Sequence, residues 1–128
     1  MIGFVIIGND VLPEALLSAL MCEMGKQEQV CAVHLAEGED VEKQRQVTLD
    51  AIDHVERGDG VLVFVDNMAA SAGYLTISIM DKAHIEVVGG VNLPMLVKAA
   101  LQRDALELSE LAELARDEGR KAIMWRTA

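Results

Sequence analysis

Two short polar turns carry the residues of this chain whose types could do chemistry. Gly8, Asn9 and Asp10 follow directly after the apolar run 2–7, and Asp66 follows a second apolar run. Short runs rich in β-branched residues are typical of strands buried on both faces. The turns should therefore lie at the carboxyl ends of two strands, where open α/β sheets bind their ligands. We expect any active site to include both turns, with Asp10 as the most obvious chemical group.

The rest of the chain alternates between strand-like and helix-like segments, which is typical of a parallel sheet with helical crossovers. The expected strands are 2–7, 30–35, 60–65 and 85–88, and the expected helices are 13–24, 40–56, 71–80, 92–102 and 108–119. In a doubly wound sheet of order 2-1-3-4, the first and third strands are neighbours at the switch point. Asn9, Asp10 and Asp66 should then converge on one crevice.

Polar residues mark where several of these helices begin. Asp40, Ser71 and Asn92 are expected N-caps, because their side-chain oxygens can accept hydrogen bonds from free backbone N–H groups. The helix that starts near Ser71 should aim such groups at the crevice. Residues 37–39 are expected to form a polar loop, and the apolar terminal segment 121–126 is predicted to be an edge strand.

Composition limits both the organisation and the partners of the chain. Its 128 residues, 52% of them hydrophobic, suffice for a single domain over 1–128 with a sizeable core. The formal charge of −10 disfavours nucleic acid and anionic lipid as partners and favours a basic protein. No apolar run approaches the ~20 residues of a membrane span, and the amino terminus lacks the basic region of a signal peptide. We expect a cytoplasmic protein that needs no metal or other cofactor.

Two other interpretations of the polar turns stay open at this point. Asp66 could simply cap a loop, and Asn9 and Asp10 could simply shape a turn, because turns favour the same residue types. A receiver domain is the second possibility, since an aspartate that ends its third strand accepts a phosphoryl group beside acids that hold magnesium. That domain also needs a fifth parallel strand ending in a lysine, whereas Lys121 precedes the last apolar segment here, which disfavours it.

Three segments resemble a known protein family. Gly-Asp-Gly-Val at 58–61, Val-Asp at 65–66 and above all Gly-Val-Asn-Leu-Pro-Met-Leu at 90–96 are similar to the enzyme IIA component of mannose-family phosphotransferase systems. The likeness extends to the first strand and to Glu-Ala-Leu-Leu at 14–17, and it covers essentially the whole chain.

The resemblance implies a fold, a reaction and partners. The fold is α/β, with a four-stranded parallel sheet of order 2-1-3-4, helices on both faces and a terminal strand, within 121–126, that pairs antiparallel across a homodimer. Proteins of this family accept a phosphoryl group from the carrier HPr onto a histidine at the end of the first strand and pass it to a IIB component. Asp66 matches the aspartate that orients the imidazole, beside a Gly-Gly-Ser/Thr-Pro turn that holds the phosphoryl oxygens.

Two departures from the family's pattern concern the phosphoryl site itself. Asn9 stands where the family has the phosphorylated histidine, and an amide is neither basic nor nucleophilic at neutral pH. The family's Phe-Gly-Gly-Ser/Thr-Pro turn is Met-Ala-Ala-Ser-Ala at 68–72, so the glycines that permit close backbone approach are absent. Met68 is expected to cover the crevice. The expected pocket residues besides Asn9 and Asp66 are Gly8, Asp10, Met68, Ala69, Ala70, Ser71 and Asn92.

No other side chain is an obvious substitute acceptor. His34, His54 and His84 are expected inside a strand, late in a helix and at the amino-terminal edge of the sheet, all away from the crevice. Asp10 is a weaker substitute, because an acyl phosphate there would usually need a bound metal. We predict a IIA-like protein that lacks phosphotransfer and acts in regulation or binding, either by docking HPr or a IIB component or by sensing a small ligand. The alternatives are an active phosphocarrier and a structural partner that forms mixed dimers.

Overall fold

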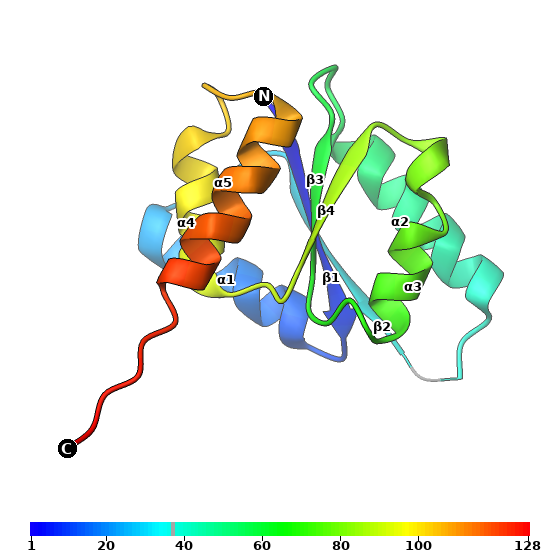
Figure 1. Cartoon of the computed structure of the whole chain (residues 1–128). Helices are drawn as coiled ribbons and strands as arrows, with labels where there is room; N and C mark the ends of the chain where they lie inside the picture. The colour runs from blue at the N-terminus through cyan, green and yellow to red at the C-terminus, as the bar shows by residue number, and fades with distance from the viewer. Residues whose placement is uncertain (37) are drawn as a thin grey trace.

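The sheet is the centre of the computed structural model, which describes residues 1–36 and 38–128; Glu37, in the predicted loop 37–39, lies outside the described residues. The strands of the described residues are β1 (Gly3–Asn9), β2 (Val30–Leu35), β3 (Val61–Val65) and β4 (Ile85–Gly89). They are parallel in the order β2-β1-β3-β4, which confirms the predicted sheet (Figure 1). Ile7 of β1 pairs with Val33 and Val65 on its two sides, so the carboxyl ends of β1 and β3 lie side by side.

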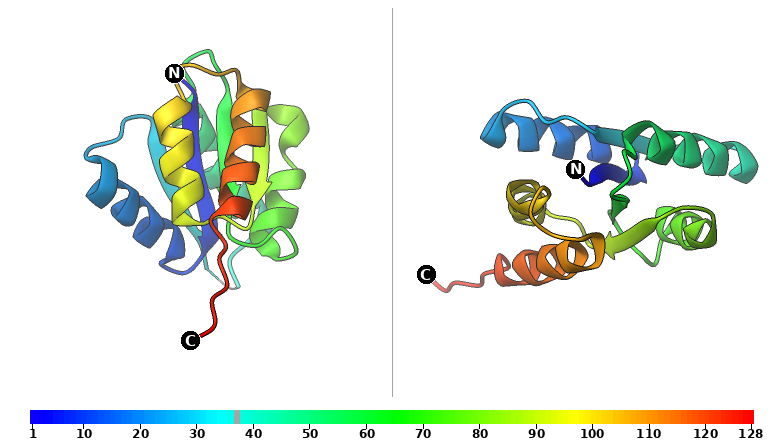
Figure 2. Two further views of the ribbon diagram at one scale, coloured as in Figure 1. Left: turned by 60° about the vertical axis from the view of Figure 1, so that its left-hand side comes forward. Right: turned by 90° about the horizontal axis from the view of Figure 1, so that it is seen from above.

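Helices cover both faces of this sheet, again as predicted. Their bounds are α1 Leu12–Met24, α2 Val41–Val55, α3 Ser71–Ile77, α4 Leu93–Gln102 and α5 Leu108–Lys121, with a short 3-10 helix at Met80–Lys82. Helices α2 and α3 lie on one face, and α1, α4 and α5 lie on the other (Figure 2). Within the described residues, no helix combines the length and the apolar composition needed to cross a bilayer.

β1 organises the core because both of its faces are buried. Val5 and Ile7 pack with residues of α2 and α3, whereas Phe4 and Ile6 pack with residues of α1, α4 and α5. The side chains alternate in this way because successive Cβ atoms of a strand point to opposite faces. By the same alternation, Asn9 at the end of the strand belongs to the α2–α3 face.

Two of the three predicted N-caps are confirmed. The Asp40 side chain accepts a hydrogen bond from the Glu42 N–H at 3.1 Å, and Asn92 caps α4. The prediction for Ser71 is wrong, because Ala70 occupies the N-cap position of α3 and Ser71 is already the first helical residue, without a side-chain capping bond. The Ser71 hydroxyl therefore plays no part in starting the helix. α3 is also shorter than predicted, since it ends at Ile77.

The last helix does not end at Gly119 as predicted but continues to Lys121. Gly119 is buried, and a Cβ atom at this position would lie 2.6 Å from Cε of Met95 on α4. The glycine thus permits α4 and α5 to pack closely. Because glycine also commonly follows the end of a helix, the sequence alone suggested that the helix ends here.

The terminal segment forms no strand within the described chain. After α5 ends at Lys121, residues 123–128 have neither helix nor strand and extend away from the sheet (Figure 1). The predicted edge strand at 121–126 is therefore wrong for this chain's own sheet. Lys121 still belongs to α5, and the residues after it extend away from β4. Ile123, Met124 and Trp125 are left exposed. Pairing of this segment with a second copy stays a prediction.

Arg103 is a buried charge that directly follows α4. It is 3% exposed, and its guanidinium donates to the carbonyl oxygens of Ile2, Glu28 and Gln29 over 2.6–3.0 Å. The guanidinium carbon lies 4.1 Å from the ring centre of Phe4. Burial lowers the pKa of Arg103 to about 10, so the side chain stays charged at neutral pH. It ties the end of α4 to the starts of β1 and β2.

Replacing Arg103 by Ala should lower the free energy of unfolding by about 3 kcal/mol, because buried carbonyl oxygens lose a charged donor. Urea denaturation followed by circular dichroism measures this change. Arg126→Ala, in the exposed terminal segment, is the matched control and should change stability by less than about 0.5 kcal/mol. If Arg103→Ala lowers the free energy of unfolding no more than the control does, the stabilising role of Arg103 is contradicted.

Candidate functional site

The Asp66 carboxylate joins the ends of β1 and β3. Its Oδ2 atom accepts a hydrogen bond from the Asn9 N–H at 3.1 Å, and its Oδ1 atom accepts one from the Asn67 N–H at 2.7 Å. Gly8 of β1 lies against this carboxylate, and a Cβ atom at Gly8 would come within 2.7 Å of Asp66 Cγ. The carboxylate can reach the backbone of Asn9 only because Gly8 has no side chain. The structure thus brings Asn9 and Asp66 together through the backbone of Asn9.

Asp10 lies beside this contact but outside it. It has a positive φ of 54°, its N–H points to the Leu35 carbonyl at 3.5 Å, and its side chain is exposed. It lines neither of the two hollows described below. The expectation that Asp10 shares the crevice is wrong, because the backbone turns outward at this residue to enter α1.

The turn after β3 is built from Asn67 and closed by Met68. The Asn67 Oδ1 atom accepts a hydrogen bond from the Ala69 N–H at 3.0 Å, and its carbonyl accepts one from the Ala70 N–H at 3.0 Å. The Met68 side chain lies over Gly89 of β4, where a Cβ atom would come within 2.0 Å of Met68 Cγ. Met68 therefore fills the space between the turn and β4.

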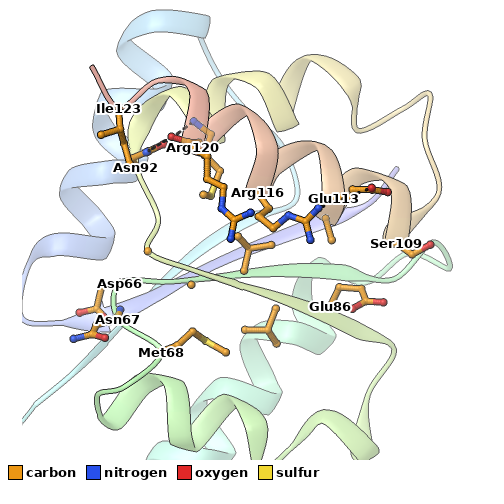
Figure 3. Close-up of a pocket in the computed structure, with 17 residues that line it drawn as sticks. Asp66, Asn67, Met68, Glu86, Asn92, Ser109, Glu113, Arg116, Arg120 and Ile123 are labelled. Carbon is orange, nitrogen blue, oxygen red and sulfur yellow. Dashed lines mark hydrogen bonds and ion pairs between the residues drawn. The ribbon is translucent and has the colours of Figure 1, made fainter. Parts of the chain in front are cut away.

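Two hollows flank the Asn9–Asp66 contact and share five of the predicted site residues between them, whereas Gly8, Asp10, Ala69 and Ala70 line neither. We call the first the β4–α5 groove; it has a volume of about 740 Å³ and is lined by Asp66, Met68 and Asn92 among others (Figure 3). We call the second the α2–α3 hollow; it has a volume of about 450 Å³ and is lined by Asn9 and Ser71 among others. The division follows from strand alternation, since Asn9 faces α2 and α3.

Arginines line the β4–α5 groove, and sequence reasoning missed them. Figure 3 shows Arg116 and Arg120 reaching from α5 over the edge of β4. Residues four apart lie on one side of a helix. The spacing of Ala112, Arg116 and Arg120 was therefore the sequence feature that could have predicted a shared face. Arg116 is engaged with Asp117 at 3.0 Å, so part of its charge is neutralised within the helix.

Asn92 has a structural role that occupies its amide. Its Oδ1 atom accepts a hydrogen bond from the Met95 N–H at 3.0 Å, and its Nδ2 atom donates to the Gly119 carbonyl at 3.1 Å (Figure 3). One side chain thus caps α4 and holds α5 beside it. Although Asn92 lines the β4–α5 groove as predicted, both edges of its amide are already bonded to the protein.

His34 lies within β2, as predicted, close to the carboxyl end of the strand. It is the last residue but one of β2 and pairs in register with Gly8, so it borders the carboxyl edge of the sheet. Its Nδ1 atom lies 2.8 Å from Glu14 Oε1 on α1. The pKa of His34 is raised by the hydrogen bond and charge of Glu14, and further by the charges of Glu39 and Asp10. Although His34 borders this edge, it lines neither the β4–α5 groove nor the α2–α3 hollow.

The other two histidines lie where they were expected. His54 is exposed in the last turn of α2, and His84 directly precedes β4 at the amino-terminal edge of the sheet. The position of His34 could have been recognised from the predicted end of its strand at Leu35, because a residue next to that end cannot lie deep within the sheet.

Comparison with known proteins identifies relatives of this chain. The family model described as EIIA-man, PTS system fructose IIA component, matches residues 3–116. The mannose-specific EIIAB component of the phosphotransferase system (PTS) of Escherichia coli K12 is 32% identical over 112 residues, which are 86% of this chain and 35% of that protein. The chain thus spans about a third of the length of this curated relative.

Solved structures share the fold. The EIIA component from Streptococcus agalactiae superposes with a TM-score of 0.88 at 22% identity, covering 97% of this chain and 96% of that one. The mannose/sorbose-specific IIA subunit from Enterococcus faecalis gives a TM-score of 0.84 at 19% identity, with 99% and 96% covered. Since the family model spans nearly all the elements described above, this protein belongs to the EIIA-man family of phosphotransferase-system IIA components.

Proposed function

We propose that this protein is a mannose-type IIA component that carries no phosphoryl group at the end of β1 and acts by binding. The observation that carries the proposal is Asn9, which stands beside Asp66 where the family resemblance puts the phosphorylated histidine. The nitrogen of an amide has no basic lone pair, so it cannot attack phosphorus as imidazole does. What Asp66 holds here is the backbone N–H of Asn9.

The turn after β3 supports the same proposal. The resemblance puts two glycines where Ala69 and Ala70 stand, and the preceding Met68 packs onto Gly89. Methyl groups and a methionine side chain restrict the close backbone approach by which such a turn holds phosphoryl oxygens. Both the nucleophile and its oxygen-binding turn therefore differ from the pattern of the family.

His34 is a poor substitute acceptor despite its position. The charges that raise its pKa come from Glu14, Glu39 and Asp10, which are all carboxylates. They favour the imidazolium form, whose nitrogens are both protonated, and they repel a phosphoryl dianion. The Nδ1 atom of His34 is also already hydrogen-bonded to the Glu14 carboxylate. The surroundings of His34 thus oppose the transfer that its place beside the crevice suggests.

Exposed apolar side chains near Asn9 support docking of a protein partner. Val11 is 68% exposed and Tyr74 is 67% exposed, and Leu12 and Val41 are also exposed at this end of the sheet. Apolar groups left in solvent around a crevice mark interaction sites more often than scattered ones do. We propose HPr or a IIB component as the partner, bound without uptake of phosphate.

A homodimer is the second part of the proposal. The outer edge of β4 has no strand beside it in the described sheet, and the β4–α5 groove follows this edge from Glu86 to Gly89. Unpaired strand edges are templates for pairing with another chain. The exposed apolar residues within 123–125 are suited to fill such a groove. We propose that the terminal segment of one copy pairs antiparallel with β4 of the other.

An active phosphocarrier, which accepts the phosphoryl group from HPr and passes it to IIB, is the competing function. The contact between the Asn9 backbone and Asp66 favours it, because a histidine at position 9 would have a carboxylate close by. The two functions differ in whether the chain takes up phosphate, and that can be measured directly.

Incubation with phosphoenolpyruvate, enzyme I and HPr should leave the native chain without a phosphoryl group, as read by intact-protein mass spectrometry. Asn9→His alone should also stay unmodified, because Ala69 and Ala70 still crowd the turn. The variant that combines Asn9→His with Ala69→Gly and Ala70→Gly should accept one phosphoryl group.

A phosphoryl group on the native chain would refute the proposed function. Transfer to the single variant Asn9→His would show that the turn can hold the phosphoryl oxygens. Asn9 alone would then account for the absence of transfer to the native chain. The matched control is Asn9→His with Asp66→Asn and both glycines, which should accept more slowly because the imidazole loses its orienting carboxylate.

Removing residues 123–128 should convert the dimer into a monomer, as measured by light scattering coupled to size exclusion. The cut leaves α5 whole, because that helix ends at Lys121. Removal of 127–128 alone is the control and should leave the dimer intact. If the shorter chain stays dimeric, an exchanged strand does not hold the copies together.

His34 should titrate above its ordinary pKa of 6.5, and Glu14→Gln should lower its pKa toward that value. The ion pair stabilises the fold fully below the unfolded pKa, and this contribution disappears as the pH rises through the folded pKa. NMR titration of the imidazole C–H signals measures the shift. Glu23→Gln, exposed and distant along α1, is the control. An unchanged His34 pKa in Glu14→Gln would contradict the pairing.

A further inference from the structure

The α2–α3 hollow is a second candidate site, separate from the β4–α5 groove. It lies at the carboxyl edge of the sheet between α2 and α3, and Asn9 is one of its lining residues. Its volume of about 450 Å³ lies within the range of small-molecule sites, which is roughly 300–1,000 Å³. A compact molecule of about six carbon atoms fits a space of this size.

Three side chains of the hollow have unused hydrogen-bonding capacity. Among the described residues, neither the Asn9 amide nor the Ser71 and Tyr74 hydroxyls form a hydrogen bond through their side chains. The amide offers one donating and one accepting edge, and each hydroxyl both donates and accepts. These groups therefore provide a mixture of donors and acceptors without any net charge.

Arg45 is the one arginine among the described residues that line the hollow, and it is held in place by the protein itself. Arg45 donates from Nε to Ser78 Oγ at 3.3 Å and forms an ion pair with Glu42. Its side chain is only 22% exposed. The Glu42 carboxylate thus offsets the positive charge of Arg45, and Glu39 in the lining adds a negative one. A phosphate ester or a carboxylate would meet little net attraction here, and the chain's charge of −10 repels it further.

We infer that the α2–α3 hollow binds a small uncharged polyhydroxylated molecule, such as a polyol, with Asn9 as its central contact; this rests on the proposed function as a binding protein. Neighbouring hydroxyls of a polyol can donate to and accept from the two edges of one amide. Ser71 and Tyr74 bond the remaining hydroxyls, and Leu35 and Leu75 pack against the carbon chain. The asparagine that replaces a nucleophile thereby becomes the recognition group.

Titration of the ¹⁵N-labelled native chain with sorbitol tests the inference. Sorbitol should shift the backbone amide signals of Asn9, Ser71 and Tyr74 in a saturable way, with a millimolar dissociation constant. Gluconate and sorbitol 6-phosphate have the same carbon chain with one anionic group, and they should bind at least about tenfold more weakly. Shifts confined to residues of the β4–α5 groove, or tighter binding of either anion, would overturn the inference.

Two variants locate the contact. Asn9→Ala and Ser71→Ala should each weaken sorbitol binding, Asn9→Ala by about tenfold, which is the loss expected for one or two hydrogen bonds. Both keep the fold, because Asp66 is bonded to the backbone of Asn9 and Ser71 caps no helix. Ser18→Ala, exposed on α1, is the matched control and should bind like the native chain. Undiminished binding by both site variants would refute the inference.

The outcomes separate this inference from the proposed function. If the native chain takes up a phosphoryl group and still binds sorbitol through Asn9, the proposed function fails and the hollow remains a polyol site. If the chain takes up no phosphate and no member of the series binds, the inference fails alone.

Discussion

The hydrogen bond from the Asn9 backbone to the Asp66 carboxylate is the constraint on which the carboxyl edge of this sheet depends. It requires Gly8, because a Cβ atom there would lie 2.7 Å from Asp66 Cγ. It also places the turn after β3, since the other oxygen of Asp66 accepts the Asn67 N–H. One close contact between two strands thus positions residues that line both the β4–α5 groove and the α2–α3 hollow.

At the opposite edge, Arg103 performs a comparable task. Its bonds to backbone carbonyls join the start of β1 to the segment before β2, and its guanidinium stacks on Phe4. β1 is therefore anchored at both ends and buried along its length, which makes residue 9 a rigidly presented position. On such a scaffold the asparagine side chain is presented in a fixed position, and hydrogen-bond recognition is the chemistry that its amide supports.

The fold could largely be predicted because its elements follow from local patterns. Buried strands appear as short apolar runs, and Asp40 and Asn92 mark helix starts by their own side chains. The errors occurred where local pattern and tertiary packing compete. Gly119 suggested a helix end, but it lies inside α5 to make room for Met95. The terminal apolar segment suggested a strand, but a strand needs a neighbour, and the described chain places none beside it.

The sequence by itself determined the family, the order of the elements and the presence of an asparagine at the end of the first strand, because each depends on residue types in chain order. The tertiary structure alone decided which side chains share a space. It assigned Asn9 and Ser71 to one hollow and Met68 and Asn92 to another, and it brought His34 next to Gly8 among carboxylates. The physical reason is that the face and the register of a strand depend on its neighbours, and these come from distant parts of the chain.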